Sequence, residues 1–333
     1  MPVKFKEIEA IDMDDLGNVL LRLVEPFVFP FLPQTRLYWL YLLTAVAIAY
    51  GVYRRSDRAR FSRFVEFVVP KTVYLHRSAL VDYRYFVVNH ISFVFLIAPL
   101  LLSASAVGTF TRRALESFAG PLPGEPAGIT TLALYTVCLA LAYDFGIFIV
   151  HYAMHRFPTL WEFHKVHHSA EVLTPVTVYR VHPLEDLLYG ATTGAATGLV
   201  HGIFAFALGG GITVVTVLNV DAALFAFYLL GYNLRHSHIW LAYPDWLSRI
   251  LISPAQHQIH HSIHPRHLDK NMGFMFAMWD AMMNTLYVPE RREDLVFGLG
   301  DGKPDDYNGV LALYVVPFRK IFERWRVKWL ART

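Results

Sequence analysis

Cysteine and charge are both scarce in this 333-residue chain. Cys138 is its only cysteine and lies in an apolar run, which excludes an intramolecular disulfide and any thiolate-rich metal or iron–sulfur site. Charged residues make up 17% of the sequence, whereas 55% is hydrophobic and 15% aromatic, which is too apolar for an ordinary soluble protein of this length. We therefore expect a membrane protein in which any metal is held by nitrogen and oxygen.

The net charge is also small, at +3. The basic residues form short clusters beside apolar runs, a pattern typical of membrane-surface anchors and not of a nucleic-acid interface. We expect no nucleic-acid partner. The first fifteen residues are too polar and acidic for a secretory signal peptide, so membrane insertion is expected to depend on internal apolar segments.

Four or five apolar segments approach the roughly 20 residues that a membrane helix needs. Gly209, Gly210 and Gly211 indicate a tight turn between the last two of them. The first and fourth segments could instead be re-entrant or interfacial, because one is short and the other is rich in Gly, Ala and Thr. The five segments span about 37–53, 85–107, 129–150, 187–208 and 212–230.

A cluster of five arginines follows the first apolar segment, whereas its other flank is acidic. By the positive-inside rule the arginine end is cytoplasmic, and counting spans from there places every histidine-rich stretch on the cytoplasmic face. The arginines are Arg54, Arg55, Arg58, Arg60 and Arg63.

The sequence thus predicts an all-α, integral-membrane helical bundle with a histidine-box cap on its cytoplasmic face. We expect one domain over 1–333, with a core at 130–290 and an N-terminal segment at 1–36. The tail at 310–333 alternates bulky apolar and basic residues, as an interfacial amphipathic helix does.

Three histidine boxes carry the chemistry. HYAMH spaces two histidines four apart, and HKVHH and HQIHH each place three at i, i+3 and i+4. On a helix these offsets project onto one face, so each box can present two or three imidazoles to one point. Imidazole suits iron, zinc, copper and nickel, and eight rings are too many for one ion, so two metals are predicted. The eight are His151, His155, His164, His167, His168, His257, His260 and His261.

Two further motifs contain possible ligands. His236 and His238 are two residues apart and cannot both face the site from a regular helix, so we expect one ligand and one supporting residue. His182 precedes Pro183, which favours a loop or a helix start, and it could be a tenth ligand or a partner of one.

Acidic residues are candidates to accept the second ring N–H of a metal-bound histidine. Asp144 lies two helical turns before His151 in an apolar run, where a carboxylate costs roughly 2.5 to 3.5 kcal/mol at mid-bilayer. We expect its partner to be a first-box histidine; the alternative is a polar contact in helix packing. The weaker candidates for the same role are Glu171, Glu185, Asp269 and Asp280.

Other histidines and aromatics have plainer interpretations. His264 and His267 flank Pro265 and are expected at the rim of the site or at the membrane surface. Ordinary hydrogen-bonded roles are expected for His76, His90 and His201. A group of aromatics could line a lipid pocket, although packing is the commoner role; these are Phe225, Phe227, Tyr228 and Tyr232.

In order along 130–290, HYAMHRFPTLWEFHKVHHSAE, HPLE, RHSH, SPAQHQIHH and DKNMGFMFAMWDAMMNTLY resemble the fatty acid hydroxylase and sterol desaturase superfamily of integral-membrane, non-haem di-iron enzymes. The resemblance implies two irons held by the eight box histidines and His236, with His238 at a variable position. DKN followed by WD is similar to alkylglycerol monooxygenase, a pterin-dependent member, whereas HPLE is similar to the sterol oxidases.

This resemblance implies an O2-dependent monooxygenase that hydroxylates a C–H bond of a lipid entering from the bilayer. A sterol or hopanoid, a fatty acyl chain, an ether lipid or an amino lipid would fit, and a desaturase would use the same ligands. Because no fused cytochrome b5 pattern such as HPGG is present, we expect a separate electron donor, a ferredoxin or cytochrome with its reductase. Zinc is expected to replace iron in some purified preparations. The alternative from another class is a histidine-rich metal transporter or sensor, in which the ligands would be spread along a path across the bilayer.

Overall fold

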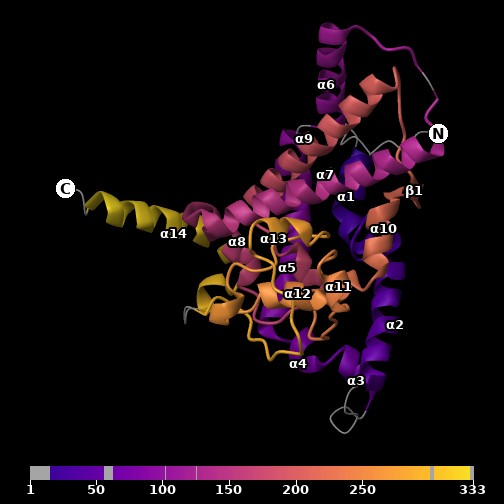
Figure 1. Ribbon diagram of the computed structural model, residues 1–333. Helices are drawn as coiled ribbons and strands as arrows, with labels where there is room; N and C mark the ends of the chain where they lie inside the picture. Colours follow the sequence, from indigo (N-terminus) through magenta and orange to yellow (C-terminus); the bar gives the residue numbers. More distant parts are fainter. Residues whose placement is uncertain (1–15, 56–62, 102, 125, 301–303, 331–333) are drawn as a thin grey trace.

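The computed structural model describes residues 16–55, 63–101, 103–124, 126–300 and 304–330, and it is mostly helical, as predicted (Figure 1). The first fifteen residues, on which the signal-peptide prediction falls, lie outside the described residues. So do Arg58 and Arg60 of the basic cluster.

The helices vary from one turn to eight turns. They are α1 Leu16–Val28, α2 Trp39–Arg55, α3 Phe64–Val68, α4 Lys71–Tyr74, α5 Arg77–Ser92, α6 Ala104–Ala119, α7 Ile129–Arg156, α8 Pro158–His168, α9 Pro183–Ala207, α10 Ala222–Leu229, α11 Asp245–Ser248, α12 Pro254–His260, α13 Met278–Met282 and α14 Val310–Leu330. Two short antiparallel strands, β1 Thr216–Val217 and β2 Val220–Asp221, pair Thr216 with Asp221 and Val217 with Val220.

Two helical stretches are long and apolar enough to cross a membrane, Arg77–Ala119 and Ile129–Arg156. The first contains α5 and α6 with a π-turn at Phe93–Ile97 between them, and the second is α7. The predicted segments at 37–53 and 187–208 also form helices, α2 and α9.

The predicted helix over 212–230 is wrong for its first half. After Gly209, whose φ is +61°, the chain is extended and forms the β1–β2 hairpin, and only Ala222–Leu229 is helical. The run from Ile212 to Val217 consists of β-branched residues, which favour extended backbone. Asp221 then starts α10 by accepting hydrogen bonds from the backbone N–H groups of Ala223 and Leu224. An eight-residue helix is too short to span a bilayer.

Small residues let α9 pack closely against both α6 and α7 (Figure 1). A Cβ added to Gly202 of α9 would lie 2.5 Å from Cβ of Thr111 in α6. One added to Gly146 of α7 would lie 2.9 Å from Cα of Thr193 in α9. The Gly-, Ala- and Thr-rich composition of α9 therefore has a packing reason, the close approach of neighbouring apolar helices.

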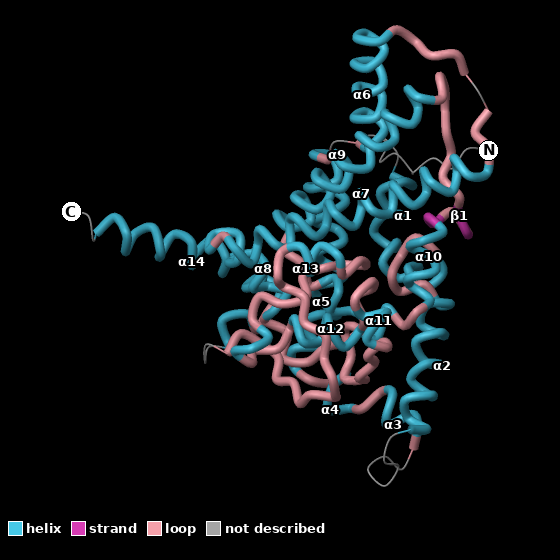
Figure 2. Tube along the Cα trace, in the orientation of Figure 1, coloured by secondary structure: helices cyan, strands magenta, loops and turns pink. Residues whose placement is uncertain are grey.

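Most loops gather on one side of α7, around α12 and α13 (Figure 2), and α12 carries one of the three histidine boxes. Beside them is a buried aromatic cluster that includes Tyr41, Phe225, Phe227, Tyr228 and Tyr232. Phe225 and Phe227 are thus packing residues, whereas Tyr228 and Tyr232 both pack in this cluster and line a cavity. Away from this region α14 extends from the body toward the C-terminus (Figure 1).

Candidate metal centre

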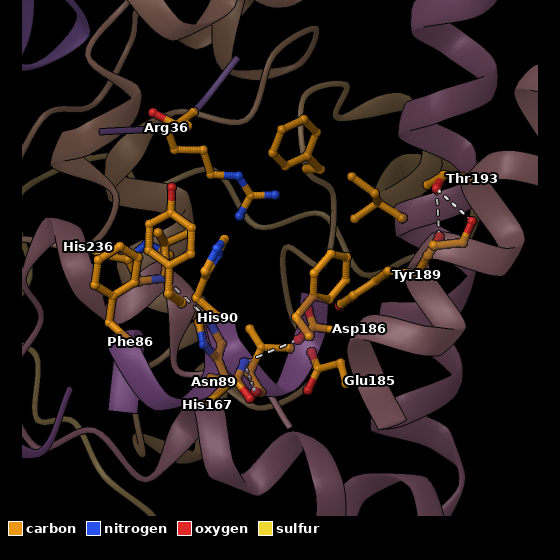
Figure 3. Close-up of a pocket in the computed structure, with 18 of the residues that line it drawn as sticks. Arg36, Phe86, Asn89, His90, His167, Glu185, Asp186, Tyr189, Thr193 and His236 are labelled. Atoms are coloured by element: carbon orange, nitrogen blue, oxygen red, sulfur yellow. Dashed lines mark hydrogen bonds between the residues drawn. The ribbon is translucent and has the colours of Figure 1, made fainter. Parts of the chain in front are cut away.

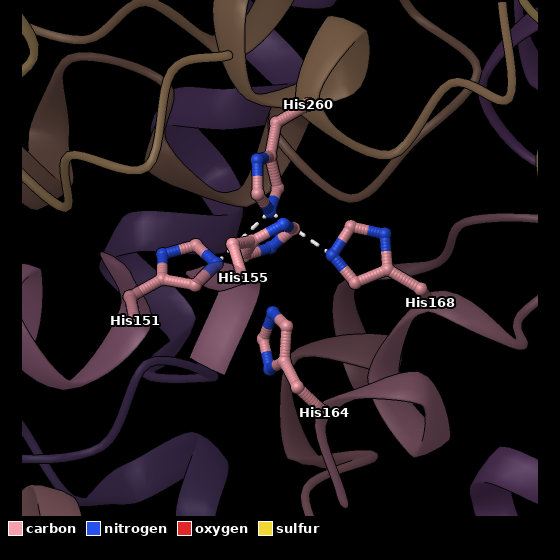
Figure 4. A group of neighbouring side chains, drawn as sticks. All are labelled: His151, His155, His164, His168 and His260. Atoms are coloured by element: carbon pink, nitrogen blue, oxygen red, sulfur yellow. Dashed lines mark hydrogen bonds between the residues drawn. The ribbon is translucent and has the colours of Figure 1, made fainter. Parts of the chain in front are cut away.

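All nine histidines expected as ligands lie in two adjoining groups. Within each group one ring nitrogen per residue lies within 4.8 Å of the others. The ring centroids of His168 and His261, one from each group, are 4.7 Å apart. The five-histidine group is His151, His155, His164, His168 and His260 (Figure 4), and the four-histidine group is His167, His236, His257 and His261.

Each HxxHH box is divided between the two groups. In α8 the i and i+4 residues, His164 and His168, belong to the five-histidine group, and the i+3 residue His167 belongs to the other. In α12 the pair His257 and His261 joins the four-histidine group, and His260 joins the first. Residues i+3 and i+4 differ by about 100° around a helix axis, so adjacent histidines diverge to two points. The sequence analysis expected each box to present its imidazoles to one point. In each HxxHH box the structure instead directs two histidines to one group and the third to the other.

Local sequence signals fix the two short helices that carry these boxes. Pro158 begins α8, and Pro254 begins α12, at positions where a helix needs no backbone N–H. Ser253 and Gln256 form a capping box that satisfies the first turn of α12. Both helices therefore present their histidines from a defined start.

The inward-facing nitrogens are acceptors that face one another. His151 donates its Nδ1–H to the carbonyl of Met272 at 2.7 Å, and His260 donates its Nδ1–H to the carbonyl of Lys270 at 2.8 Å. In neutral rings of this tautomer Nε2 carries a lone pair and no proton. Yet the two Nε2 atoms lie 2.9 Å apart. Two lone pairs at this distance repel unless a cation lies between them.

The other Nε2–Nε2 distances agree. His168 to His260 is 3.1 Å, and the contacts within the four-histidine group are 3.0 to 3.3 Å. Two nitrogens bound to one ion at about 2.1 Å, at angles of 90° to 110°, would lie about 3.0 to 3.4 Å apart. Burial, followed by the neighbouring rings, holds the pKa values of His164 and His168 well below their ordinary range, which keeps the lone pairs available. The donor set fits metal ions.

Four of the five rings in the five-histidine group have an acceptor for Nδ1–H. Besides the carbonyls of Met272 and Lys270, Glu185 accepts from His164 at 2.8 Å, and Asp269 accepts from His155 at 3.1 Å. Such partners fix the ring orientation and raise the basicity of a metal ligand. Glu185 and Asp269, two of the weaker acidic candidates from the sequence, thus accept the Nδ1–H of a histidine in this group, as that role requires.

The four-histidine group is supported differently. His167 donates to the carbonyl of Arg180 at 3.3 Å, and Arg180 is fixed by a buried ion pair with Asp82 at 2.7 Å. Nδ1 of His257 is buried without a hydrogen-bond partner. Among the described residues, no carboxylate contacts the four rings.

The expected partner of Asp144 is wrong. Its carboxylate accepts from the backbone N–H groups of Met275 and Phe276 and from the indole of Trp279, and not from a histidine. Two helical turns separate it from His151 by about 10 Å along the axis, which exceeds a direct contact. Asp144 instead holds the loop whose carbonyl at Met272 accepts from His151.

Asp280 acts on the same loop, accepting from the N–H groups of Met272 and Gly273. Glu171 lies outside both groups and pairs with Arg77. These two weaker acidic candidates therefore do not contact a histidine of either group.

Neither additional histidine joins a group. His182 caps α9 by accepting from the N–H of Leu184, and its Nε2–H donates to the carbonyl of Tyr314, so both nitrogens are used. His238 donates to the carbonyl of Phe67 at 2.6 Å, on the far side of the RHSH turn from His236. The remaining single histidines, among them His76, His90, His201, His264 and His267, also lie outside both groups.

One feature escaped sequence reasoning entirely, and another was anticipated only through two of its residues, Tyr228 and Tyr232. The backbone carbonyls that accept from His151, His167 and His260 have no sequence signal, because every residue has a carbonyl. The other is a cavity of about 520 Å³, lined mainly by apolar and aromatic side chains, that opens onto histidines of both groups (Figure 3). Its size is typical of small-molecule sites.

Helical architecture and paired histidine groups together define a class of protein, a helical metalloprotein whose site is built from imidazoles. Residues 136–285, which contain all nine histidines, match the fatty acid hydroxylase family. This match covers a little under half of the chain and supports the superfamily that its motifs resemble.

Several curated proteins are similar in sequence. An alkylglycerol monooxygenase of Caenorhabditis elegans is 27% identical over 47% of this chain and 28% of its own length. An ornithine lipid hydroxylase of Rhizobium tropici is 26% identical over 65% of this chain and 61% of its own length. Sphinganine C4-monooxygenase 1 of Arabidopsis thaliana is 29% identical over 49% of this chain and 58% of its own length. The chain thus spans less than two thirds of each relative. No solved structure matches it significantly.

Proposed function

We propose that this chain is a membrane-bound, non-haem di-iron oxygenase that hydroxylates a C–H bond of a lipid with O2 and external electrons. The observation that carries the proposal is the convergence of nine imidazoles in two adjoining groups beside an apolar cavity. The names of the relatives support the reaction class, since they include a monooxygenase and a hydroxylase that act on lipids.

The five-histidine group would hold one iron and the four-histidine group the other. When bound, the iron pair supplies the activation of O2 and the oxidation of the C–H bond. The chain orients the imidazoles through Glu185, Asp269 and the loop carbonyls, and it leaves the cavity side of both groups open to substrate. Apolar lining keeps competing water away from the substrate carbon.

We infer four membrane-embedded elements, α2, α5 with α6, α7 and α9, in a single domain over 1–333. The basic end of α2, at Arg54 and Arg55, lies toward the side of the molecule where the loops around α12 gather (Figure 1). By the positive-inside rule this face is cytoplasmic. α14 is proposed to lie at the interface, because Phe322, Trp325 and Trp329 are exposed among its basic residues.

Trp161 gives electrons a route from the surface. Its ring is partly exposed and lies 5.0 Å from the ring of His155 and 5.2 Å from that of His168. We propose that a separate ferredoxin or cytochrome delivers electrons on this side, to the five-histidine group. The cavity approaches the centre through other residues, so donor and substrate would not compete.

The test is to purify the full chain in detergent with iron and measure metal per chain and product together. We expect two tightly held irons and, with lipid extract, 18O2 and a reductant, a lipid that gains one labelled oxygen. A lipid that loses two hydrogens without gaining oxygen would instead show a desaturase. One exchangeable zinc ion and no turnover after iron loading would contradict the proposal and favour the transporter or sensor.

A further inference from the structure

Six charged side chains besides the histidines line the cavity, and most of them have polar partners within the protein. Arg22 pairs with Glu25 at 3.2 Å. Glu185 accepts from His164 at 2.8 Å, and Asp186 accepts from Asn89 at 3.2 Å. Arg22, Glu25 and Asp186 thus each have a polar partner, and one oxygen of Glu185 is used by His164.

Arg235 is also engaged. Its side chain is buried, donates to the carbonyl of Ile252 at 3.2 Å and lies over the rings of Tyr232 and Phe274. It immediately precedes His236 and holds that turn against the start of α12. Its role is therefore to position the site.

Arg36, unlike Arg235, is only half-buried. Its side chain points into the cavity (Figure 3), and its guanidinium carbon lies 5.5 Å and 5.8 Å from the ring centroids of Phe274 and Tyr232. Tyr143 hydrogen-bonds to it, and Asp186, which lines the same cavity, interacts with it electrostatically. Among the described residues, no carboxylate lies within 4.0 Å of it. Arg36 is half-buried, and an anionic oxygen group that enters the cavity would form charge-assisted hydrogen bonds with its guanidinium.

The same cavity is lined by His151 and His164 of the five-histidine group and by His236 and His257 of the other. A ligand held at Arg36 by its head would extend its apolar part along the aromatic and aliphatic wall. The distance from the anchored head would then select which carbon faces the histidines.

We propose that Arg36 binds the anionic oxygen group, a carboxylate or a phosphate, of a single-chain lipid and thereby sets substrate class and position. The role of Arg36 in substrate selection rests on the proposed function, whereas the binding of the anionic lipid can be measured without any turnover. Because the guanidinium forms a planar fork, a lysine would replace its charge without its paired hydrogen bonds.

The experiment measures equilibrium binding of labelled dodecanoate, dodecyl phosphate and dodecanol to the full chain in a nonionic detergent. Each ligand partitions into the micelles to the same extent with every variant. A change between variants in the ratio of anion affinity to dodecanol affinity therefore reports on the binding site. We expect the wild type to bind dodecanoate or dodecyl phosphate at least about tenfold more tightly than dodecanol. The tighter of the two anions identifies the head group.

Arg36→Met should bring that ratio close to one, Arg36→Lys should give an intermediate ratio, and Arg22→Met, in the same cavity but paired, should keep the wild-type ratio. Iron content of each variant shows that the fold is intact. A wild type without anion preference, or an Arg36→Met variant that retains it, would overturn the inference. If Arg36→Met loses the preference for anions and no variant turns over lipid, the role of Arg36 is supported and the proposed oxygenase function is contradicted. If the wild type turns over lipid but shows no preference for anions, the oxygenase function is supported and the role of Arg36 is contradicted.

Discussion

The five-histidine group and the four-histidine group use the same ligand atom in different electrostatic surroundings. Two carboxylates, Glu185 and Asp269, hydrogen-bond to rings of the first group. Near the second are cations, since Arg235 and Arg36 both contribute to keeping the pKa of His236 well below its ordinary range, after burial and His167. Carboxylate partners raise the basicity of a ligand and offset the charge of a bound cation. We therefore expect the first group to hold its ion more tightly than the second.

The largest expected effect is loss of one ion with loss of all turnover. His260→Ala removes the ring whose Nε2 contacts both His151 and His168, so iron should fall from two per chain to about one. Turnover should fall more than about 100-fold, beyond the 10- to 100-fold typical of residues that only orient a ligand. Iron analysis and oxygen incorporation measure this. His264→Ala, three residues beyond the box, is the matched control, and retained turnover in His260→Ala would refute the ligand role.

The second prediction concerns the loop that only the five-histidine group uses. Asp144→Ala leaves one buried and two partly buried donors without their acceptor, and we expect a loss of about 3 kcal/mol in the free energy of unfolding. Iron should be lost first from the group that contains His151, because Met272 moves. Asp144→Asn retains one carbonyl oxygen and should lose less. Denaturation in detergent is the measurement, and equal stability of Asp144→Ala and wild type would contradict the anchoring role.

The third prediction concerns the order and separation in time of the release of the two ions. In the wild type a chelator should remove iron from the four-histidine group first, giving two phases. Glu185→Gln removes the buried charge beside His164 and should weaken the five-histidine group roughly tenfold, which brings the phases together. The time course of iron release is followed optically. Two phases unchanged by Glu185→Gln would show that the carboxylates do not distinguish the groups.

The smallest effect is expected at Asp269. Its side chain is 49% exposed, whereas that of Glu185 is 1% exposed, so water screens its interaction with His155. Asp269→Asn should change iron affinity only a few-fold, below the change in Glu185→Gln. The same chelation assay compares them. An effect of Asp269→Asn as large as that of Glu185→Gln would mean that burial does not set the strength of these contacts.

Prediction from sequence succeeded where the signal is local. The helix over 129–150 and the helical HxxHH boxes follow from apolar composition and i, i+3, i+4 spacing, and the structure contains them in α7, α8 and α12. It failed at 212–221, where an apolar run of β-branched residues was interpreted as a helix. Apolar composition alone does not distinguish a membrane helix from buried extended chain, and here the β-branched content favoured the latter.

The sequence by itself determined how many imidazoles there are, that they lie on helices, and that no thiolate accompanies them. Only the tertiary structure decided which histidine joins which group, because the HxxHH spacing places rings on two sides of a helix and each side meets a different neighbour. The acceptors of His151 and His260 are carbonyls at Met272 and Lys270, the first of them 121 positions away in sequence. Arg36 reaches the same cavity from a segment more than a hundred residues before the first box. Spacing along a helix is a local property, whereas partners across the chain depend on how the helices pack.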